Sequence, residues 1–298
     1  MDRFHEMLVY VAVAEEQGFA AAARRLGLSP PAVTRAVAAL EERLGTRLLT
    51  RTTRTVRVTD AGERYLEDAR RILAELETAD EAAAGIHAVP SGQLTVTAPV
   101  MFGRLYVLPG ILDYLHQYPE TQVHTMFLDR VVNLLEEGID VAVRIGQLPD
   151  SNLRAVRVGS VRVVVCASPD YLSVFGRPET PQQLVKHQVV TVAAASGQTG
   201  WKFRDQSRAV PLKARLTVTS NDAAVSAAKQ GFGITRLLSY QVASEINEGS
   251  LVPVLEDYEP VASPVQIVHR EGRLQSARLR AFVGLLGERL RENRLLKV

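Results

Sequence analysis

Residues 26–44 carry the most regular pattern of apolar and polar positions in the chain. Apolar side chains recur at steps of four, three and four, at Val33, Val37, Leu40 and Leu44. This spacing places them on one face of an α-helix. Ser29 can cap the start of that helix with its hydroxyl, and Pro30 and Pro31 fit a first turn that needs no N–H donors. Thr34 and Arg35 fall off the apolar face, so we expect them to point outward near the leading end.

Two shorter apolar patterns precede this helix. One helical face is formed by Phe4, Leu8 and Val11. Gly18 is expected to end that first helix, and residues 19–26 predict a second, short helix of small side chains. Gly27 then supplies a turn before the third helix. Two short helices, a glycine turn and a helix with an exposed polar end are typical of a helix-turn-helix, whose last helix enters the DNA major groove.

A Thr- and Val-rich segment follows Gly45. Residues 48–59 read LLTRTTRTVRVT and carry an arginine at every third position, at Arg51, Arg54 and Arg57. The pattern predicts a two-stranded wing. Its arginines can reach backbone phosphates or the adjacent minor groove.

A long helix is predicted to begin at Thr59 or Asp60. Apolar positions along it repeat at heptad spacing, with charged residues between them. The candidate dimerisation residues are Leu66, Ala69, Ile72, Leu73 and Leu76. This spacing favours a coiled coil with a second copy of the chain. The alternative, an amphipathic helix that packs on its own domain, stays open.

Residues 87–92 form a hinge-like break, after which strands and helices alternate. Strands are predicted at 93–98, 122–128, 141–145, 161–166, 189–192, 216–219 and 266–269. Helices are predicted at 105–118, 131–137, 222–229, 240–248 and 276–293. Such alternation indicates an α/β fold with a mostly parallel sheet covered on both faces. About 200 residues of it suffice for one large domain or two small lobes.

Charge is distributed unevenly, although the 298-residue chain has a net charge of only +2. Between Arg24 and Arg57 there are eight arginines and only two acids, Glu41 and Glu42. A local excess of this kind is expected of a phosphate-binding face, and a solvated surface is the alternative. The single cysteine, Cys166, excludes an intramolecular disulfide and lies in a β-branched run typical of a buried thiol. No signal peptide or membrane-length apolar run appears, so we expect a cytoplasmic protein with no membrane contact.

The sequence contains no recognisable catalytic set. A P-loop, a GxGxxG after a strand, HExxH and GxSxG are all absent, and the six histidines have no ligand-like spacing. We therefore expect that the protein is not an enzyme and that it binds no metal and no cofactor. Three strand-to-helix corners, at 98–103, 220–224 and 231–234, together suggest a pocket for a small molecule, although each alone is a common structural corner. Trp201 can stack on an aromatic ligand or belong to a core.

Residues 19–62, FAAAARRLGLSPPAVTRAVAALEERLGTRLLTRTTRTVRVTDAG, resemble the helix-turn-helix motif of LysR-type transcriptional regulators nearly position by position. The resemblance extends over the whole chain. It implies an α/β protein with an all-α N-terminal part: a winged helix-turn-helix at 1–59, a dimerising linker helix at 60–90 and an effector domain at 91–298. The effector domain resembles type 2 periplasmic binding proteins. Its expected lobes are 91–162 with 268–298, and 163–267.

The resemblance assigns DNA-contacting positions in the N-terminal part. They are Ser29, Pro30, Pro31, Thr34, Arg35, Arg51, Arg54 and Arg57. Many members carry Gln where this chain has Pro30. Because a Gln can contact a base edge, its absence moves more of the readout to Thr34, Arg35 and DNA shape.

Effector-cleft positions are assigned in the same way. They are Val100, Met101, Phe102, Leu128, Arg144, Trp201, Phe203, Asn221, Gly233 and Ile234. Val100 and Leu128 are apolar where many members place a hydroxyl, which favours a more apolar ligand. Arg144 can pair with an anion, or equally with an acid of the protein. The hinge is expected at 163–165 and 265–267.

The sequence thus predicts a LysR-type regulator that binds an interrupted palindromic promoter site as a dimer of dimers and responds to a small effector. Its expected partners are double-stranded DNA, the effector, further copies of the chain as homodimer and homotetramer, and RNA polymerase. Two alternatives remain: a solute-binding protein with a helical dimerisation extension and no DNA role, and an α/β enzyme with a fused dimerisation domain.

Overall fold

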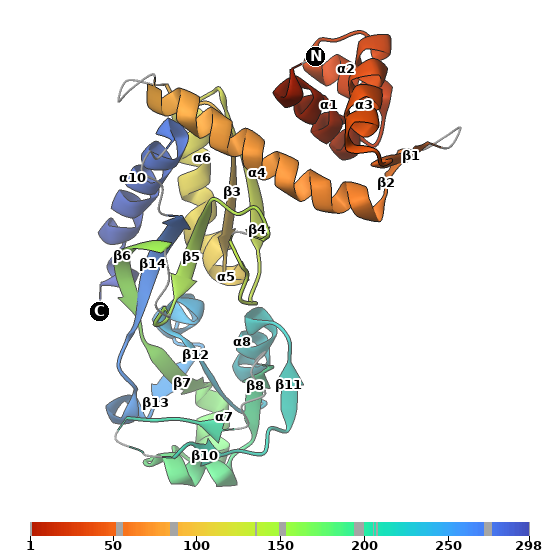
Figure 1. The fold of residues 1–298 in the computed structure, drawn as a ribbon. Helices are drawn as coiled ribbons and strands as arrows, with labels where there is room; N and C mark the ends of the chain where they lie inside the picture. The colour runs from red at the N-terminus through yellow and green to blue at the C-terminus, as the bar shows by residue number, and fades with distance from the viewer. Residues whose placement is uncertain are drawn as a thin grey trace. The chain divides into compact units, whose positions relative to one another are not determined.

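The computed structural model describes residues 2–51, 56–83, 89–134, 136–148, 153–193, 200–204, 206, 208–270 and 276–297. The chain divides into two compact units, drawn in Figure 1. The first comprises Met1–Val89, Leu135–Gly138 and Gly272–Ala277, and the second comprises Pro90–Leu134, Ile139–Glu271 and Arg278–Val298.

The first unit contains a three-helix cluster, a hairpin and a long helix. These elements are α1 (Arg3–Glu16), α2 (Phe19–Leu26), α3 (Pro30–Leu44), β1 (Leu49–Arg51), β2 (Val56–Val58) and α4 (Asp60–Ala83). The two strands pair antiparallel, with Leu49 opposite Val58. The predicted helix-turn-helix, wing and long helix are all present (Figure 1).

Local details of these helices differ from the sequence predictions. Gln17, not Gly18, takes the left-handed conformation after α1, with φ 50°. Gly18 instead is the extended N-cap of α2. Ser29 is extended at the start of α3, but its hydroxyl makes no capping hydrogen bond. The predicted turn at Gly27 is confirmed by its φ of 64°.

The core of the first unit lies between α1, α3 and the start of α4. Val33, Val37 and Leu40 are fully buried in it, as the helical spacing predicts. Leu44, the fourth residue of that stripe, is instead 37 % exposed. Phe4 and Leu8 are likewise exposed on α1.

The wing is held closely against the start of α4. A Cβ at Gly62 would lie 2.2 Å from the carbonyl oxygen of Leu48, so only glycine fits there. The hydroxyl of Tyr10 donates a hydrogen bond to the carbonyl of Gly62 at 2.9 Å. One carboxylate oxygen of Glu41 accepts hydrogen bonds from the N–H groups of Leu48 and Leu49 at 2.8 and 3.0 Å. These contacts fix the direction in which the wing leaves α3.

The second unit contains two five-stranded sheets, each the centre of one lobe. In lobe I the order is β4-β3-β5-β14-β6, and in lobe II it is β11-β8-β12-β7-β13. The strands of lobe I are β3 (Gly92–Ala98), β4 (Thr121–Phe127), β5 (Val141–Ile145), β6 (Leu153–Val161) and β14 (Ser263–Arg270). Those of lobe II are β7 (Val163–Ala167), β8 (Val189–Val192), β11 (Leu216–Val218), β12 (Ile234–Leu238) and β13 (Val252–Val254). A short pair, β9 (Gly200–Trp201) and β10 (Val210–Pro211), lies apart from both sheets.

Both sheets are mixed, which corrects the expected mostly parallel sheet. In lobe I, β3 is parallel to β4 and β5, and β14 is antiparallel to β5 and β6. In lobe II, β8 is parallel to β11 and β12, and β7 is antiparallel to β12 and β13. The antiparallel pairs arise because strands that cross between the lobes enter each sheet from the opposite end.

Helices and short turns cover the sheets. They are α5 (Val100–Phe102), η1 (Gly103–Val107), α6 (Leu108–Gln117), α7 (Pro169–Phe175), η2 (Pro181–Lys186), α8 (Asn221–Lys229), η3 (Ser239–Gln241), α9 (Ala243–Asn247), η4 (Glu256–Tyr258), α10 (Ala277–Glu292) and η5 (Arg294–Leu296). No helix is described between 131 and 137, where one was predicted; position 135 lies outside the described residues. The sequence prediction also missed β6, β12, β13 and α7.

The crossing between the lobes differs from the predicted hinge. Residues 163–165 and 265–267 lie inside β7 and β14, not between the sheets. All of β14 belongs to lobe I, so the predicted lobe boundary at 267/268 is too late, and the chain changes lobes before Ser263. Arg162 marks the first crossing, because it alone separates β6 from β7.

Arg162 connects three chain segments at this crossing. Its N–H donates to the hydroxyl of Ser239 at 3.1 Å, and its carbonyl accepts from the N–H of Ser239 at 2.8 Å. Its guanidinium donates to both carboxylate oxygens of Glu259 at 3.3 and 3.1 Å. Glu259 is buried, and burial raises the pKa of its carboxyl while Arg162 lowers it.

Candidate nucleic-acid interface and ligand site

The leading end of α3 is exposed, as predicted. Ser29, Pro30, Pro31 and Arg35 are exposed, and Thr34 is partly buried beside the core residue Val33. The Nε of Arg35 donates a long hydrogen bond of 3.4 Å to the carbonyl of Pro31, one turn earlier. This bond holds the base of the side chain against the helix and leaves the two terminal nitrogens for another acceptor.

Of the three arginines predicted for the wing, one has a described side chain. Arg57 is exposed on β2. Arg51 ends β1, but its side chain, like the whole of Arg54, lies outside the described residues. Their roles stay predictions.

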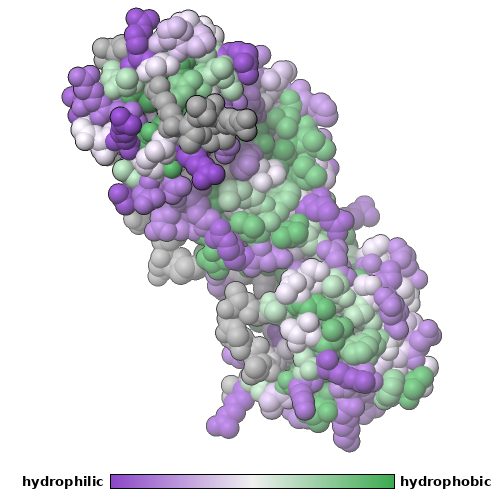
Figure 2. All heavy atoms as spheres, turned by 90° about the vertical axis from the view of Figure 1, so that its right-hand side faces the viewer, coloured by the Kyte–Doolittle hydropathy of each residue, from purple (hydrophilic) through white to green (hydrophobic). Residues whose placement is uncertain are grey.

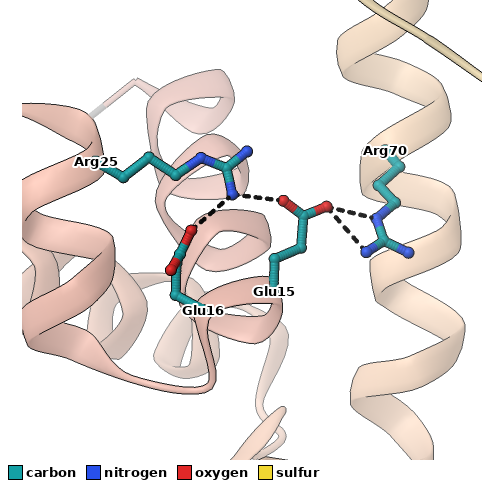
Figure 3. A network of polar contacts seen from close by, with 4 residues as sticks. All are labelled: Glu15, Glu16, Arg25 and Arg70. Atoms are coloured by element: carbon teal, nitrogen blue, oxygen red, sulfur yellow. Dashed lines mark hydrogen bonds and ion pairs between the residues drawn. The ribbon is translucent and has the colours of Figure 1, made fainter. Parts of the chain in front are cut away.

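The described arginine side chains between positions 24 and 57 separate into two groups. Arg25 pairs with Glu15 and Glu16 at 2.8 and 3.4 Å, and Arg43 pairs with the buried Glu6 at 3.0 Å. Figure 3 shows that Glu15 also binds Arg70 of α4, at 2.9 Å, so one carboxylate joins α1, α2 and α4. Among the described residues, no acidic partner contacts the second group, which is Arg24, Arg35, Arg47 and Arg57.

This division corrects the excess of positive charge counted from the sequence. Two of the eight arginines are neutralised by acids that lie outside the counted span, at Glu6, Glu15 and Glu16. Because these acids are close in space and distant along the chain, a count over a sequence window misses them. The second group remains as a set of exposed cations suited to phosphate.

The predicted dimerisation residues also divide. Leu66, Ala69 and Leu73 pack against the core of the first unit, and Ala69 is fully buried there. Ile72 and Leu76 are partly exposed and do not join that core. Three of the five positions thus pack within the first unit, as the alternative interpretation requires, and dimerisation through Ile72 and Leu76 stays a prediction.

Several of the predicted effector residues pack in cores, support close strand packing or begin a helix in the second unit. Phe102, Phe203 and Ile234 are buried in the cores, and Leu128 packs partly buried beside Val132. A Cβ at Gly233 would lie 2.4 Å from the carbonyl of Gln188, so this glycine serves close strand packing. Asn221 begins α8, which is capped by Ser220, whose hydroxyl accepts from the N–H of Ala223 at 3.2 Å. Val100 is 43 % exposed, and its N–H donates to Asp129 at 3.0 Å.

A cavity of about 440 Å³ lies between α5 and η1 of lobe I and α8 and η3 of lobe II. Its lining includes Met101, Arg104, Leu105, Asp222, Val225, Lys229, Tyr240 and Glu245. Met101 alone of the ten predicted effector residues belongs to it. Arg104 and Asp222 form an exposed ion pair of 3.0 Å across the two lobes, and Tyr240 packs edge-on against Phe102 with ring centroids 5.1 Å apart.

Arg144 of lobe I and Arg236 of lobe II differ in their partners. Arg144, which the sequence nominated for an anion, is already engaged: one of its nitrogens donates to the carbonyl of Val132 at 3.5 Å, and it has further interactions. Arg236 was not nominated. Its guanidinium carbon lies 5.9 Å from the ring centroid of Trp201 and 5.7 Å from that of Phe203. The signal that could have found it is a single charged residue inside the apolar strand segment ITRLL.

The structure also describes the surroundings of the single cysteine, of possible metal ligands and of possible membrane helices. Burial raises the pKa of the Cys166 thiol to about 12, so this cysteine is an unreactive core residue. Across the described residues, no group of three His, Cys, Asp or Glu side chains could hold a metal ion. Within the same residues, each helix is too short or too polar to cross a bilayer.

Known proteins match both units. A model of the "bacterial regulatory helix-turn-helix protein, lysR family" matches residues 4–63, and a model of the "LysR substrate binding domain" matches residues 87–291. The HTH-type transcriptional regulator CrgA of Neisseria meningitidis serogroup B is 32 % identical over 290 residues, 97 % of each chain. The probable HTH-type transcriptional regulator LtrA of Klebsiella pneumoniae is 31 % identical over 288 residues, 95 % of this chain and 93 % of LtrA.

A solved structure of Neisseria meningitidis CrgA has a TM-score of 0.63 to this chain, with coverage of 97 % of this chain and 99 % of that one. The helix-turn-helix model and the substrate-binding-domain model together cover nearly all the elements described above, from α1 to α10. This chain therefore belongs to the LysR family of DNA-binding transcriptional regulators, which carry an effector-binding domain and are not enzymes.

Proposed function

We propose that this regulator binds an interrupted palindromic promoter site as a dimer of dimers, and that a small effector bound between the lobes changes this binding. The observation that carries the proposal is the exposed leading end of α3 together with four arginines that contact no acid among the described residues. Pro31, Thr34 and Arg35 would read the major groove, and Arg57, with Arg51 and Arg54, would reach the backbone. The helix-turn-helix match disfavours the alternative of a solute-binding protein without a DNA role.

Two apolar surfaces support the proposed assembly. On α4, Ile72 and Leu76 are left over from packing within the first unit. On η1 and α6, Leu105, Leu108 and Leu112 recur at helical spacing and are 37–49 % exposed. Figure 2 shows apolar side chains gathered on the surface of the second unit. Two separate self-association surfaces are what a dimer of dimers requires.

The role of DNA as the partner leads to two further inferences, about RNA polymerase and about the location in the cell. A regulator on a promoter lies beside RNA polymerase, which we infer as a further partner. A protein that binds the chromosome of a bacterium acts in the cytoplasm, and this is where we place it.

A DNA titration tests the proposal. Purified full-length protein is titrated against a labelled duplex from the region upstream of its own coding sequence, and against a shuffled duplex of equal length, at several salt concentrations. We expect the upstream duplex to bind roughly 10³-fold more tightly or better, and affinity for both to fall steeply with salt. Equal affinity for the two duplexes at every salt concentration would refute the proposed promoter recognition.

A further inference from the structure

Arg236 is a partly buried cation without an ionic partner. It lies on β12, the central strand of lobe II, between Thr235 and Leu237, which are both buried. Trp201 and Phe203 face its guanidinium with their rings, at 5.9 and 5.7 Å from the guanidinium carbon. Throughout the described part of the chain, no hydrogen bond or ion pair reaches this guanidinium.

This arrangement leaves the hydrogen-bonding capacity of Arg236 unused. Burial lowers the pKa of Arg236, which shows that its charge has lost part of its hydration. Ring faces attract a cation, but they do not accept the five directed N–H bonds of a guanidinium. No nitrogen of Arg236 is both sealed from solvent and without a partner, so the free N–H groups are accessible to a ligand.

The position of Arg236 matches the place where α/β sheets bind ligands. β12 runs parallel to β8, and ligands of such sheets lie at the carboxyl ends of the parallel strands. At that end of β12, Leu238 packs against the core of lobe I, and Tyr240 contacts Phe102 of lobe I. Arg236 is therefore two residues from the junction of the lobes. Its side chain emerges on the face of the sheet that also carries Ile234, Phe203 and Trp201.

Three other arginines of the two lobes cannot take the same role, because each is already engaged. Arg104 pairs with Asp222, Arg162 pairs with Glu259, and Arg144 is bonded to the carbonyl of Val132 and has other partners. One available cation balances one negative charge. A singly charged carboxylate fits this balance, whereas a phosphate dianion would leave an excess negative charge in a partly buried site.

We propose that Arg236 binds the carboxylate of the effector, and that the effector is a small monocarboxylic acid with an apolar body. The guanidinium edge would bind the two carboxylate oxygens side by side, and Trp201 and Phe203 would hold the guanidinium plane in place. Trp201 is only partly buried, so its ring offers the apolar body a contact surface. The identification as an effector site rests on the proposed function; the carboxylate site itself rests on Arg236.

The chain offers its own probe for this site. Trp201 is the only tryptophan, so intrinsic tryptophan fluorescence reports directly on the neighbourhood of Arg236. Full-length protein is titrated with a panel of linear and aryl monocarboxylates, including phenylacetate, and with the matching neutral amides, including phenylacetamide. The same titrations are run on Arg236→Met, which keeps the length of the side chain and removes its charge. The control is Arg289→Met, which removes an exposed arginine that pairs with Asp113 and does not line the cavity.

We expect at least one carboxylate to change the fluorescence saturably, and its amide to bind more weakly. Arg236→Met should lose roughly 10- to 100-fold in affinity for that carboxylate and little for the amide, and Arg289→Met should bind like the original protein. Arg236→Met should also melt at the same temperature or higher, because it removes a partly desolvated charge without a partner.

Three results would overturn the proposal: no carboxylate of the panel binding, equal binding by the original protein and Arg236→Met, or a clearly lower melting temperature for Arg236→Met, which would make Arg236 a structural residue. DNA binding of the original protein and of Arg236→Met is measured separately, without ligand. If the original protein did not bind DNA specifically, the proposed function would be refuted. A failed carboxylate titration with DNA binding intact would refute this inference alone.

Discussion

Four unpaired arginines of the first unit and Arg236 of the second unit lie in opposite environments. In the first unit, Arg24, Arg35, Arg47 and Arg57 are exposed and keep their hydration. In the second, Arg236 is partly buried under two aromatic rings. An exposed cation needs no counter-ion from the protein and can meet any phosphate, whereas a partly desolvated one is best stabilised by an anion that enters its site. The location of an unpaired arginine thus indicates the size of its partner: a polyanion outside, a small anion inside.

The leucines of α4 also differ in whether they have a packing partner within their own unit. Leu73 packs on the core of its own unit, and Leu76 does not. We expect Leu76→Asp to leave the first unit folded and to separate dimers into monomers, with DNA affinity falling roughly 10²- to 10⁴-fold as the second reading head is lost. Sedimentation velocity and a DNA titration measure the two effects.

Leu73→Asp is the matched variant for this test. It places a charge against the core, so we expect it to lower the melting temperature of the first unit whatever it does to assembly. If Leu76→Asp stays dimeric at micromolar concentration while Leu73→Asp merely unfolds, α4 is an ordinary amphipathic helix and the partner surface lies elsewhere.

The next prediction separates free from paired arginines on the DNA-binding unit. Arg57→Ala should weaken binding to every duplex by roughly 10- to 100-fold per dimer and lower the salt slope by about two, one for each copy. Arg25→Ala removes an arginine bound to Glu15 and Glu16, so the salt slope should stay the same. The measurement is affinity against salt concentration. Equal slopes for Arg57→Ala and the original protein would show that exposure does not identify phosphate contacts here.

Sequence reasoning was most successful in the first unit, because its signals are local. The helices of 19–26 and 30–44 have caps, turns and apolar spacing within a few residues of each other. It was wrong in details: Gln17 takes the left-handed conformation expected of Gly18, the hydroxyl of Ser29 makes no capping hydrogen bond, and Leu44 is exposed. The acids that neutralise Arg25 and Arg43 lie up to 37 residues away and could not be counted from a local window.

In the second unit the missing information was non-local throughout. β12 is a five-residue strand interrupted by Arg236, and periodicity over so few residues does not identify a strand. Five of the ten effector positions carried over by resemblance are buried, because a resemblance assigns positions along the chain and not the direction of side chains. Arg236 becomes notable only when Trp201 and Phe203, more than 30 residues earlier, are placed over it.

The last prediction concerns a paired arginine of the second unit, where we expect the smallest effect. Arg162→Ala keeps the backbone bonds to Ser239 and removes the guanidinium from the buried carboxylate of Glu259. Because the arginine side chain is 44 % exposed, we expect a loss of about 1 kcal/mol in unfolding free energy at neutral pH. Arg104→Ala, which breaks the more exposed pair with Asp222, should have a smaller effect.

The loss caused by Arg162→Ala should depend on pH with a defined sign. Burial raises the pKa of Glu259 in the folded protein, Arg162 lowers it, and removing Arg162 raises it further; Arg204 and Glu256 act on it in opposite directions and are unchanged. A raised folded pKa gives stability that is complete below the unfolded value, about 4.3, and is lost as pH rises through the folded pKa. Chemical denaturation from pH 4.5 to 7.5 should therefore show the deficit of Arg162→Ala growing with pH. A deficit that is constant or shrinks would mean that Arg162 stabilises the crossing by packing alone and that its charge plays no part there.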